Sequence, residues 1–221
     1  MVDSINYCSK KDLYSYINQL KTIMKIDSDV IGFDFFDMCK RVRGLKIELV
    51  DFTDKSLRGL SLPSDRIILL NSSRTNIERN FDCAHEFIHV VKHKDEGYQT
   101  FNCFDKLHPR QNPFLEWQAN EGAAEFLVPY KVFIPLFCNL VSNCHSRSDY
   151  LELKDYLAYH FYVPYSVITL RIENLKYEIR QYELGRSIDS LEILSITKQE
   201  QKGIHIASYN AFFKYYSYIA Q

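Results

Sequence analysis

The 221-residue sequence predicts a mostly helical α+β fold. Apolar residues recur at spacings of three and four across residues 77–91 and 115–126, which indicates two amphipathic helices. Between residues 46 and 72 the pattern changes to alternation and short apolar runs, which indicates strands. From about residue 130 the helical spacing returns, and no low-complexity linker divides the chain.

Charge, cysteine pattern and hydropathy limit the classes of protein to which this chain can belong. A formal net charge of −1 gives the chain no overall attraction to nucleic acid or anionic lipid. The six cysteines form no C-x-x-C pair, no signal peptide is evident, and no apolar run approaches a membrane span. We therefore expect a cytoplasmic protein with free thiols. We also expect two parts: a core domain over residues 1–140, and a C-terminal helical region over residues 141–221 that packs on this domain.

The first 72 residues are expected to form scaffold helices and then strands. The spacing of Leu13, Ile17 and Leu20 predicts a first helix, and a second short helix is predicted over residues 33–43. Residues 46–50 and 66–71 read as strands, and residues 57–62 fit a third strand between them. An exposed edge of this sheet can hold an extended peptide by strand addition, although the sequence does not identify the edge strand.

A metal-binding motif lies on the next predicted helix. Thr75 and Glu78 form a capping box at its start. His85, Glu86 and His89 then form an H-E-x-x-H motif, in which the two histidines are i and i+4 and project from one helix face. Neutral imidazole binds zinc, and Glu86 is placed to take a proton from water. Because two histidines on a buried helix can also be ordinary polar core residues, the interpretation depends on a third ligand.

The preferred third ligand is Glu116. Asn112 and Pro113 read as the N-cap and first residue of a helix that ends at Pro129. Glu116 shares one face of this helix with Asn120 and with small alanines that allow close approach to the histidine helix. Two histidines and one glutamate form a ligand set that hydrolytic zinc uses.

Glu121 and Glu125 are rival ligands on the same predicted helix. Glu121 points roughly 140° away from Glu116 around the helix axis. Glu125 lies on the far side of the apolar stripe, nearer the helix end. We therefore prefer Glu116.

Other histidines offer weaker alternatives. His93 continues the histidine face by one turn. There it can contact the ligand histidines on the side away from the metal, or it can face the substrate. Residues 94–111 read as a polar and aromatic loop at the rim of the cleft. Within this loop, His108 and Cys103 form a weaker metal alternative.

The C-terminal third is expected to be helical. Residues 130–140 predict one helix, and residues 148–175 predict two helices joined by a turn, which resembles a helix-turn-helix element that can place a helix in a DNA groove. The second of these helices carries Arg171 among many apolar residues, which is typical of a helix that packs in a core. Direct DNA binding is therefore the less favoured function of this element. Residues 176–221 read only as folded.

Together these segments resemble the ImmA/IrrE metallopeptidases. The stretch from Arg79 to His93 resembles the family pattern R-x-x-F-x-x-A-H-E-x-x-H-x-x-x-H, with Phe81, Ala84 and the three histidines at matching positions and Arg79 one position after that of the pattern's arginine. The second pattern, E-x-x-A-N followed by L-x-P, matches from Glu116 to Pro129, and the weaker similarity extends from about residue 30 to about residue 175. One departure is Gly122, where the family usually has a bulky apolar residue.

The resemblance implies a fold and a chemistry. It implies a zincin-like metallopeptidase core with a small antiparallel sheet beside the histidine helix, followed by a helix-turn-helix-like element. It also implies Zn²⁺ as the cofactor and peptide bond hydrolysis as the reaction, with Glu86 as the proton acceptor. A donor to the developing oxyanion is expected in addition, and His93, Tyr130 and His160 are the candidates.

The substrate follows from the resemblance alone. Family members of this size cleave helix-turn-helix repressors that are encoded nearby on phages or other mobile genetic elements, so we expect an anti-repressor protease whose partner is such a repressor. The alternatives are a non-proteolytic regulator with a structural zinc site, which binds protein or DNA, and a toxin–antitoxin component with the same core. A structural site is expected to have four protein ligands, whereas this sequence offers three.

Overall fold

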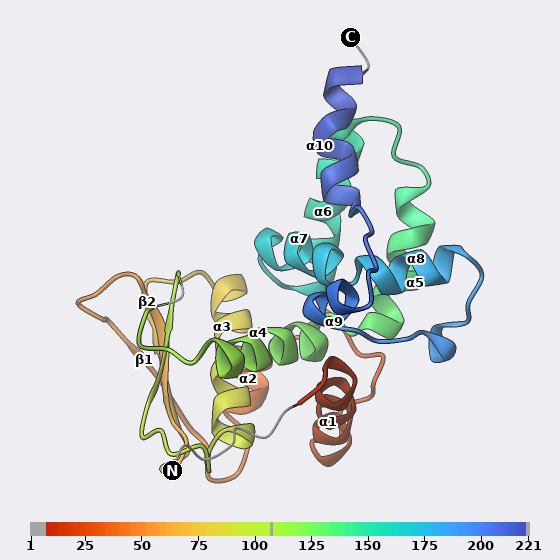
Figure 1. Ribbon diagram of the computed structural model, residues 1–221. Coiled ribbons are helices and arrows are strands. Elements are labelled where there is room, and N and C mark those ends of the chain that lie inside the picture. Colours follow the sequence, from red (N-terminus) through yellow and green to blue (C-terminus); the bar gives the residue numbers. More distant parts are fainter. Residues whose placement is uncertain (1–7, 107, 220–221) are drawn as a thin grey trace. The chain divides into compact units, whose positions relative to one another are not determined.

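The computed structural model describes residues 8–106 and 108–219 (Figure 1). Its packing divides into two compact units, and each is described by itself. The first unit contains residues 33–127, and the second contains residues 8–32 and 128–219. The packing boundary therefore lies at residue 127, and the second unit also takes in the first long helix. The division at residue 140 stays a prediction about domains that fold on their own.

The first unit contains a four-stranded sheet. Its strands are β1 (Lys46–Val50), β2 (Leu57–Leu62), β3 (Ile67–Asn71) and β4 (Phe101–Phe104), in the order β1-β3-β2-β4. β2 pairs antiparallel with both β3 and β4, with an irregularity between Leu57 and Gly59, whereas β1 pairs parallel with β3. The predicted strands are confirmed, but the expectation of an antiparallel sheet is wrong for β1. The β2–β3 hairpin places β3 rather than β2 beside β1, and two reversals of the chain make β1 and β3 parallel.

Strand β4 was not expected, because its segment reads as a loop. Its four residues alternate between buried and half-buried positions, and Phe101 and Cys103 are the buried ones. Four residues are too short a run for alternation to stand out among the polar neighbours. Among the described residues, β4 forms one edge of the sheet and β1 forms the other.

Helices α3 (Asn76–Lys92) and α4 (Pro113–Leu127) pack against each other, and α3 also covers β2 and β3. The Thr75 hydroxyl accepts a hydrogen bond from the backbone N–H of Glu78, and the Glu78 carboxylate accepts one from Thr75, so the predicted capping box is confirmed. The Asn112 side chain accepts from the backbone N–H of Phe114 at 3.0 Å, which confirms it as the cap of α4. Both helices therefore begin where their capping residues predict.

The short helix α2 (Phe35–Cys39) completes the core of the first unit and is shorter than the predicted span of residues 33–43. The Phe35 ring meets Phe87 of α3 and Phe126 of α4 edge-on, with ring centroids 5.3 and 4.8 Å apart. The Asn80 side chain accepts a hydrogen bond from the backbone N–H of Phe35 at 2.6 Å. These contacts join the three helices.

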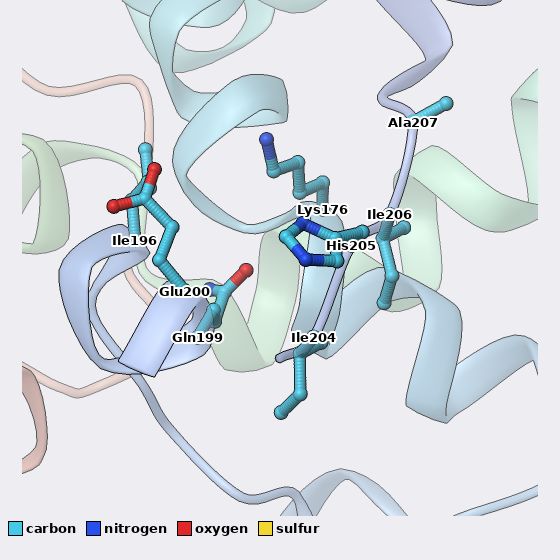
Figure 2. A pocket seen from close by; sticks show the side chains of 8 residues that line it. All are labelled: Lys176, Ile196, Gln199, Glu200, Ile204, His205, Ile206 and Ala207. Carbon is cyan, nitrogen blue, oxygen red and sulfur yellow. The ribbon is translucent and has the colours of Figure 1, made fainter. Parts of the chain in front are cut away.

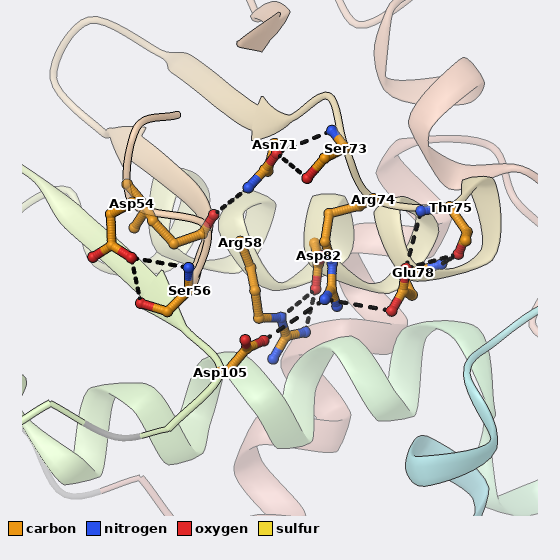
Figure 3. A network of polar contacts seen from close by, with 11 residues as sticks. Asp54, Ser56, Arg58, Asn71, Ser73, Arg74, Thr75, Glu78, Asp82 and Asp105 are labelled. Carbon is orange, nitrogen blue, oxygen red and sulfur yellow. Dashed lines mark hydrogen bonds and ion pairs between the residues drawn. The ribbon is translucent and has the colours of Figure 1, made fainter. Parts of the chain in front are cut away.

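A buried carboxylate fastens α3 to the sheet (Figure 3). Asp82 is fully buried one turn before the first motif histidine. Its carboxylate accepts from Arg58 Nε of β2 at 2.8 Å and from Arg74 Nε, just before α3, at 3.1 Å. Arg74 Nη1 also lies 3.6 Å from the exposed carboxylate of Asp105. Two cations on one buried anion fix the position of α3 against β2.

We expect Asp82→Asn to lower the free energy of unfolding by about 2 kcal/mol, because the neutral amide loses the charge-assisted hydrogen bonds to both arginines. Asp105→Asn is the matched control and is expected to change it by less than about 0.5 kcal/mol, since the Asp105 side chain is 53% exposed. Urea unfolding of the two variants and the wild type measures the difference. Equal effects would mean that Asp82 does not fasten the helix.

The second unit is helical throughout. Its helices are α1 (Lys10–Ile23), α5 (Tyr130–Val141), α6 (Arg147–Phe161), α7 (Tyr165–Asn174), α8 (Lys176–Glu183), the 3₁₀ helix η1 (Ile188–Ser190), α9 (Ile196–Gln201) and α10 (Tyr209–Ile219). The predicted helices in residues 130–175 are confirmed, and the described part of the region that read only as folded contains α8, η1, α9 and α10. Two buried, positively charged side chains connect its segments. Arg171 of α7 donates to the Val128 carbonyl and to the Tyr14 hydroxyl of α1. Lys10 of α1 pairs with Glu178 of α8 at 2.9 Å.

No single described helix is both long and apolar enough to cross a membrane; α4 and α5 satisfy the criteria of length and composition only when they are taken together.

Candidate metal centre

The structure brings His85, His89 and Glu116 together. His85 Nε2 and His89 Nε2 are 3.2 Å apart. The Glu116 carboxylate oxygens lie 3.4 Å from His85 Nε2 and 3.7 Å from His89 Nε2. All three side chains are buried, and they come from α3 and α4. Three ligand atoms from two helices therefore converge on one point, and this cluster can hold a metal ion.

The spacing of these atoms fits zinc. A tetrahedral zinc binds nitrogen and oxygen ligands at about 2.0–2.1 Å, which places neighbouring ligand atoms ~3.3–3.4 Å apart. The three observed separations, 3.2, 3.4 and 3.7 Å, bracket that value. Three protein ligands leave one position of a tetrahedron for water or substrate, as in catalytic rather than structural zinc sites.

The other ring nitrogens of the two histidines also have partners. His85 Nδ1 lies 3.1 Å from the side-chain oxygen of Asn120. His89 Nδ1 lies 2.9 Å from Nδ1 of His93, which is itself fully buried. These contacts leave the Nε2 atoms of both ligand histidines directed at the cluster. Asn120 and His93 therefore contact the Nδ1 atoms of His85 and His89, on the opposite side of each ring from the Nε2 atom that faces the cluster.

Glu86 lies beside His85 with its side chain enclosed. It is fully buried, and neither carboxylate oxygen has a hydrogen-bond partner among the described residues. Burial raises the pKa of Glu86 to about 7; the carboxylate of Glu116 adds to this shift, whereas His85 and the nearby hydroxyl of Ser61 oppose it. The Ser61 hydroxyl is close enough to act on the charge but does not have the geometry of a hydrogen bond. A carboxylate with an unused acceptor and a pKa near neutrality is suited to proton transfer.

The weaker metal alternative paired Cys103 with His108, but the structure places Cys103 with other residues. Its sulfur groups with His85 and Glu86, within reach of a common ion, whereas His108 is exposed and packs on Phe104. The cause is strand β4, which pairs Cys103 with Gly59 and turns both toward α3. Cys103 is thus a neighbour of the site that the sequence did not reveal, because the strand that carries it was not predicted.

The sequence comparison then identifies the family. Residues 41–173 match the Peptidase M78 model, described as the IrrE N-terminal-like domain, which is more than half of the chain. The chain belongs to this family. The match includes every residue of the metal cluster. Family membership implies a metallopeptidase-like domain and a bound metal.

A structural comparison supports the fold of this IrrE-like chain. A solved structure of a Mycobacterium tuberculosis transcriptional regulator superposes with a TM-score of 0.51 at 19% sequence identity. The aligned region covers 77% of this chain and 48% of that one, so the chain spans about half the length of the solved structure. At this identity the similarity concerns the fold alone. No curated protein matches the chain significantly.

The remaining predicted site residues of this M78 chain lie apart from the cluster or in the second unit. Glu121 and Glu125 are buried on α4, and neither joins the histidines in a described ligand group. Tyr130 stacks on Tyr14, with ring centroids 5.5 Å apart, and His160 stacks on Tyr156 at the same separation. The roles of Tyr130 and His160 as oxyanion donors stay predictions.

The second unit also holds a cavity of about 320 Å³ (Figure 2). Its lining combines three isoleucines with polar side chains; the lining residues are Lys176, Ile196, Gln199, Glu200, Ile204, His205, Ile206 and Ala207. Lys176 is already paired with Glu173 at 2.7 Å. None of these residues belongs to the metal cluster of the IrrE-like domain, so the cluster remains the candidate functional site.

We expect the metal-free protein to lose stability between about pH 4.5 and pH 7 because of Glu86. Its folded-state pKa lies above the ordinary value of 4.5, so in this window the folded chain keeps a proton that the unfolded chain has released. The loss on raising the pH is on the order of 3 kcal/mol. Urea unfolding at pH 5 and pH 8, with zinc removed, measures it. Glu86→Gln is expected to lack this component, and an identical pH dependence in that variant would contradict the assignment.

Gly59 faces the Glu86 side chain, so its lack of a side chain matters. A Cβ at this position would lie 3.0 Å from Glu86 Oε1 and 3.1 Å from Leu70 Cδ2. We expect Gly59→Ala to displace the Glu86 carboxylate by a few tenths of an ångström and to lower kcat about tenfold, with unchanged zinc content. Steady-state kinetics and elemental analysis of the variant measure both quantities. Full activity would mean that the position of Glu86 tolerates this displacement.

Proposed function

We propose that this protein is a zinc-dependent endopeptidase that cleaves one specific protein. The observation that carries the proposal is the convergence of His85, His89 and Glu116 at zinc-ligand spacing, with the unpartnered Glu86 carboxylate beside them. Family membership supports the peptidase class. Cys103, which groups with His85 and Glu86, does not join the three ligands in a closed set of four. This arrangement favours a catalytic over a structural zinc.

In this mechanism each residue has a separate task. His85, His89 and Glu116 would hold Zn²⁺, which supplies Lewis acidity that polarises a peptide carbonyl and lowers the pKa of water. Glu86 accepts the proton of the attacking water at its carboxylate and then delivers it to the leaving amine. Burial assists this transfer. Little water solvates the charge of the enclosed carboxylate, so the carboxylate accepts a proton more readily.

The edge strand β4 is suited to hold an extended substrate. It packs against α3, where Phe101 stacks on His89 with ring centroids 4.1 Å apart. Its outer edge has no strand partner among the described residues, although the Asn102 carbonyl accepts a hydrogen bond from the Gln111 side chain. A peptide added to this edge would lie beside the metal cluster and would have to displace Gln111. We infer that only an unfolded or locally opened segment of a protein can bind in this way.

The substrate we propose is a helix-turn-helix transcriptional repressor, and the protein would thus act as an anti-repressor. The proposal rests on the resemblance described above. Direct DNA reading by this chain is disfavoured by α7, because its one cation, Arg171, is buried and bonds to Val128 and Tyr14. Exposed positions on α7 include Ser166 and Leu170, which carry no charge.

The test is cleavage of the repressor encoded beside the gene. Purified zinc-loaded protein is mixed with that repressor, and the fragments are identified by mass spectrometry. We expect one or a few cleavage sites, which disappear when zinc is chelated and return when zinc is restored. An unrelated helix-turn-helix protein of similar size is the control and should stay intact. An uncut repressor in the presence of zinc-loaded protein would overturn the choice of substrate.

A further inference from the structure

His89 is connected through its second ring nitrogen to a chain of two further side chains. Its Nδ1 lies 2.9 Å from His93 Nδ1, and His93 Nε2 lies 3.4 Å from the side-chain oxygen of Gln118. His93 and Gln118 are 0% and 2% exposed, so water cannot readily replace either contact. Gln118 belongs to α4, the same helix that supplies Glu116.

The order of donors and acceptors in this chain follows from the metal cluster. Nε2 of His89 faces His85 and Glu116, so it must keep its lone pair to bind a metal. The proton of neutral His89 is therefore on Nδ1, and it is donated to His93. Nδ1 of His93 must then be an acceptor, which places its own proton on Nε2, where Gln118 offers an oxygen. One arrangement of protons satisfies every contact.

We propose that His93 and Gln118 are positioning residues that hold His89 in the tautomer and orientation in which it binds the metal. This inference rests on the proposed zinc site and extends it to two residues outside the set of three ligands. The backbone supports the same geometry, because the N–H of His93 donates to the His89 carbonyl at 3.0 Å at the end of α3. Phe101 covers the outer face of the His89 ring.

The two ligand histidines differ in how exposed to water the partner of their Nδ1 atom is. His85 Nδ1 contacts Asn120, whose side chain is exposed, so water can take its place when the amide is removed. The partner of His89 is enclosed, and its removal leaves a buried N–H without an acceptor. The contact with His93 should therefore matter more for zinc affinity than the contact with Asn120.

The decisive comparison uses two replacements of His93. His93→Asn keeps an acceptor oxygen near the position of Nδ1 but fills less volume, whereas His93→Leu fills the volume and has no acceptor. We expect His93→Leu to weaken zinc binding ~10–100-fold and His93→Asn to weaken it several-fold less. A role in packing alone predicts the opposite order. Competition with a chelator of known zinc affinity gives the dissociation constants, and Asn120→Ala is expected to show a smaller loss than His93→Leu.

Controls separate this inference from the proposed function. Val90→Ala, a change at another buried position of the same helix that is not part of this chain of side chains, should leave zinc affinity unchanged. If wild-type protein binds no zinc, the proposed function fails. If the wild type binds one zinc that His85→Ala removes, but the two His93 variants bind it equally or in the reverse order, this inference alone fails.

The tautomers of His89 and His93 can also be measured directly on the wild-type protein. Long-range ¹H–¹⁵N correlation spectra of the zinc-loaded protein distinguish the two tautomers of each histidine. We expect His89 to carry its proton on Nδ1 and His93 to carry its proton on Nε2. A proton on Nδ1 of His93 would overturn the inference, because that atom could not then accept from His89.

Discussion

Glu86→Gln is expected to lower peptidase turnover by ~10²–10⁴-fold while zinc stays bound. Glutamine has the shape of glutamate but cannot take a proton from water, and Glu86 is not one of the three residues His85, His89 and Glu116 that converge as the proposed ligands. The amide also removes the buried charge, so we expect the variant to fold at least as well as the wild type at pH 8.

The measurement combines turnover of the proposed repressor substrate with zinc per chain by elemental mass spectrometry. Glu121→Gln is the matched control, because it makes the same change at another buried glutamate, one that lies outside the ligand groups. It should keep both zinc and activity. An active Glu86→Gln protein would remove Glu86 from the proposed mechanism, whereas loss of zinc in that variant would make it a ligand.

Glu116→Ala is expected to lower zinc affinity by more than the ~10–100-fold that is typical when an outer partner of a ligand is lost. It removes one of the three proposed ligands and leaves two histidines, 3.2 Å apart, without the carboxylate that would balance the charge of the ion. Protein purified without a metal-binding tag should therefore contain about one zinc per chain in the wild type and little in the variant.

The rival carboxylates provide the control for this experiment. Glu125→Ala removes a buried glutamate from the same helix, and it should leave the zinc content near that of the wild type. Undiminished zinc in Glu116→Ala would mean that another residue is the third ligand. Absence of zinc from the wild type would mean that the fold persists in this chain without the chemistry.

Local signals predicted the part of the site that lies on helices. The capping residues Thr75 and Asn112 mark where α3 and α4 begin, and helical spacing then places His85 and His89 on one face. The position of Glu116 followed from the same reasoning about helix faces. These features depend on neighbours within one or two turns, so a single sequence carries them.

Contacts between distant segments could not be read in this way. Strand β4 is four residues long, and its pairing with β2 depends on residues at least 40 positions away in the chain. Without that strand, the approach of Cys103 to His85 and of Phe101 to His89 was hidden. Gln118 was missed for a related reason, because it serves His93 on another helix and belongs to no periodic pattern of its own.

The parallel pairing of β1 was hidden as well. Alternation within residues 46–50 predicts a strand but not the direction of its neighbour. The direction depends on which side of the β2–β3 hairpin β1 occupies, and this is decided by packing of the whole first unit.

The position of Glu116, 27 residues after His89, has a thermodynamic consequence. The ligands come together only when α3 and α4 pack, so an ion that binds the cluster binds the folded chain and not the unfolded one. By mass action, free zinc at 100 times its dissociation constant adds about 2.7 kcal/mol to the free energy of unfolding, and at 1,000 times about 4.1 kcal/mol. The supply of free zinc would therefore set the lifetime of the folded protein as well as its activity, and scarcity of the ion would expose the chain to degradation.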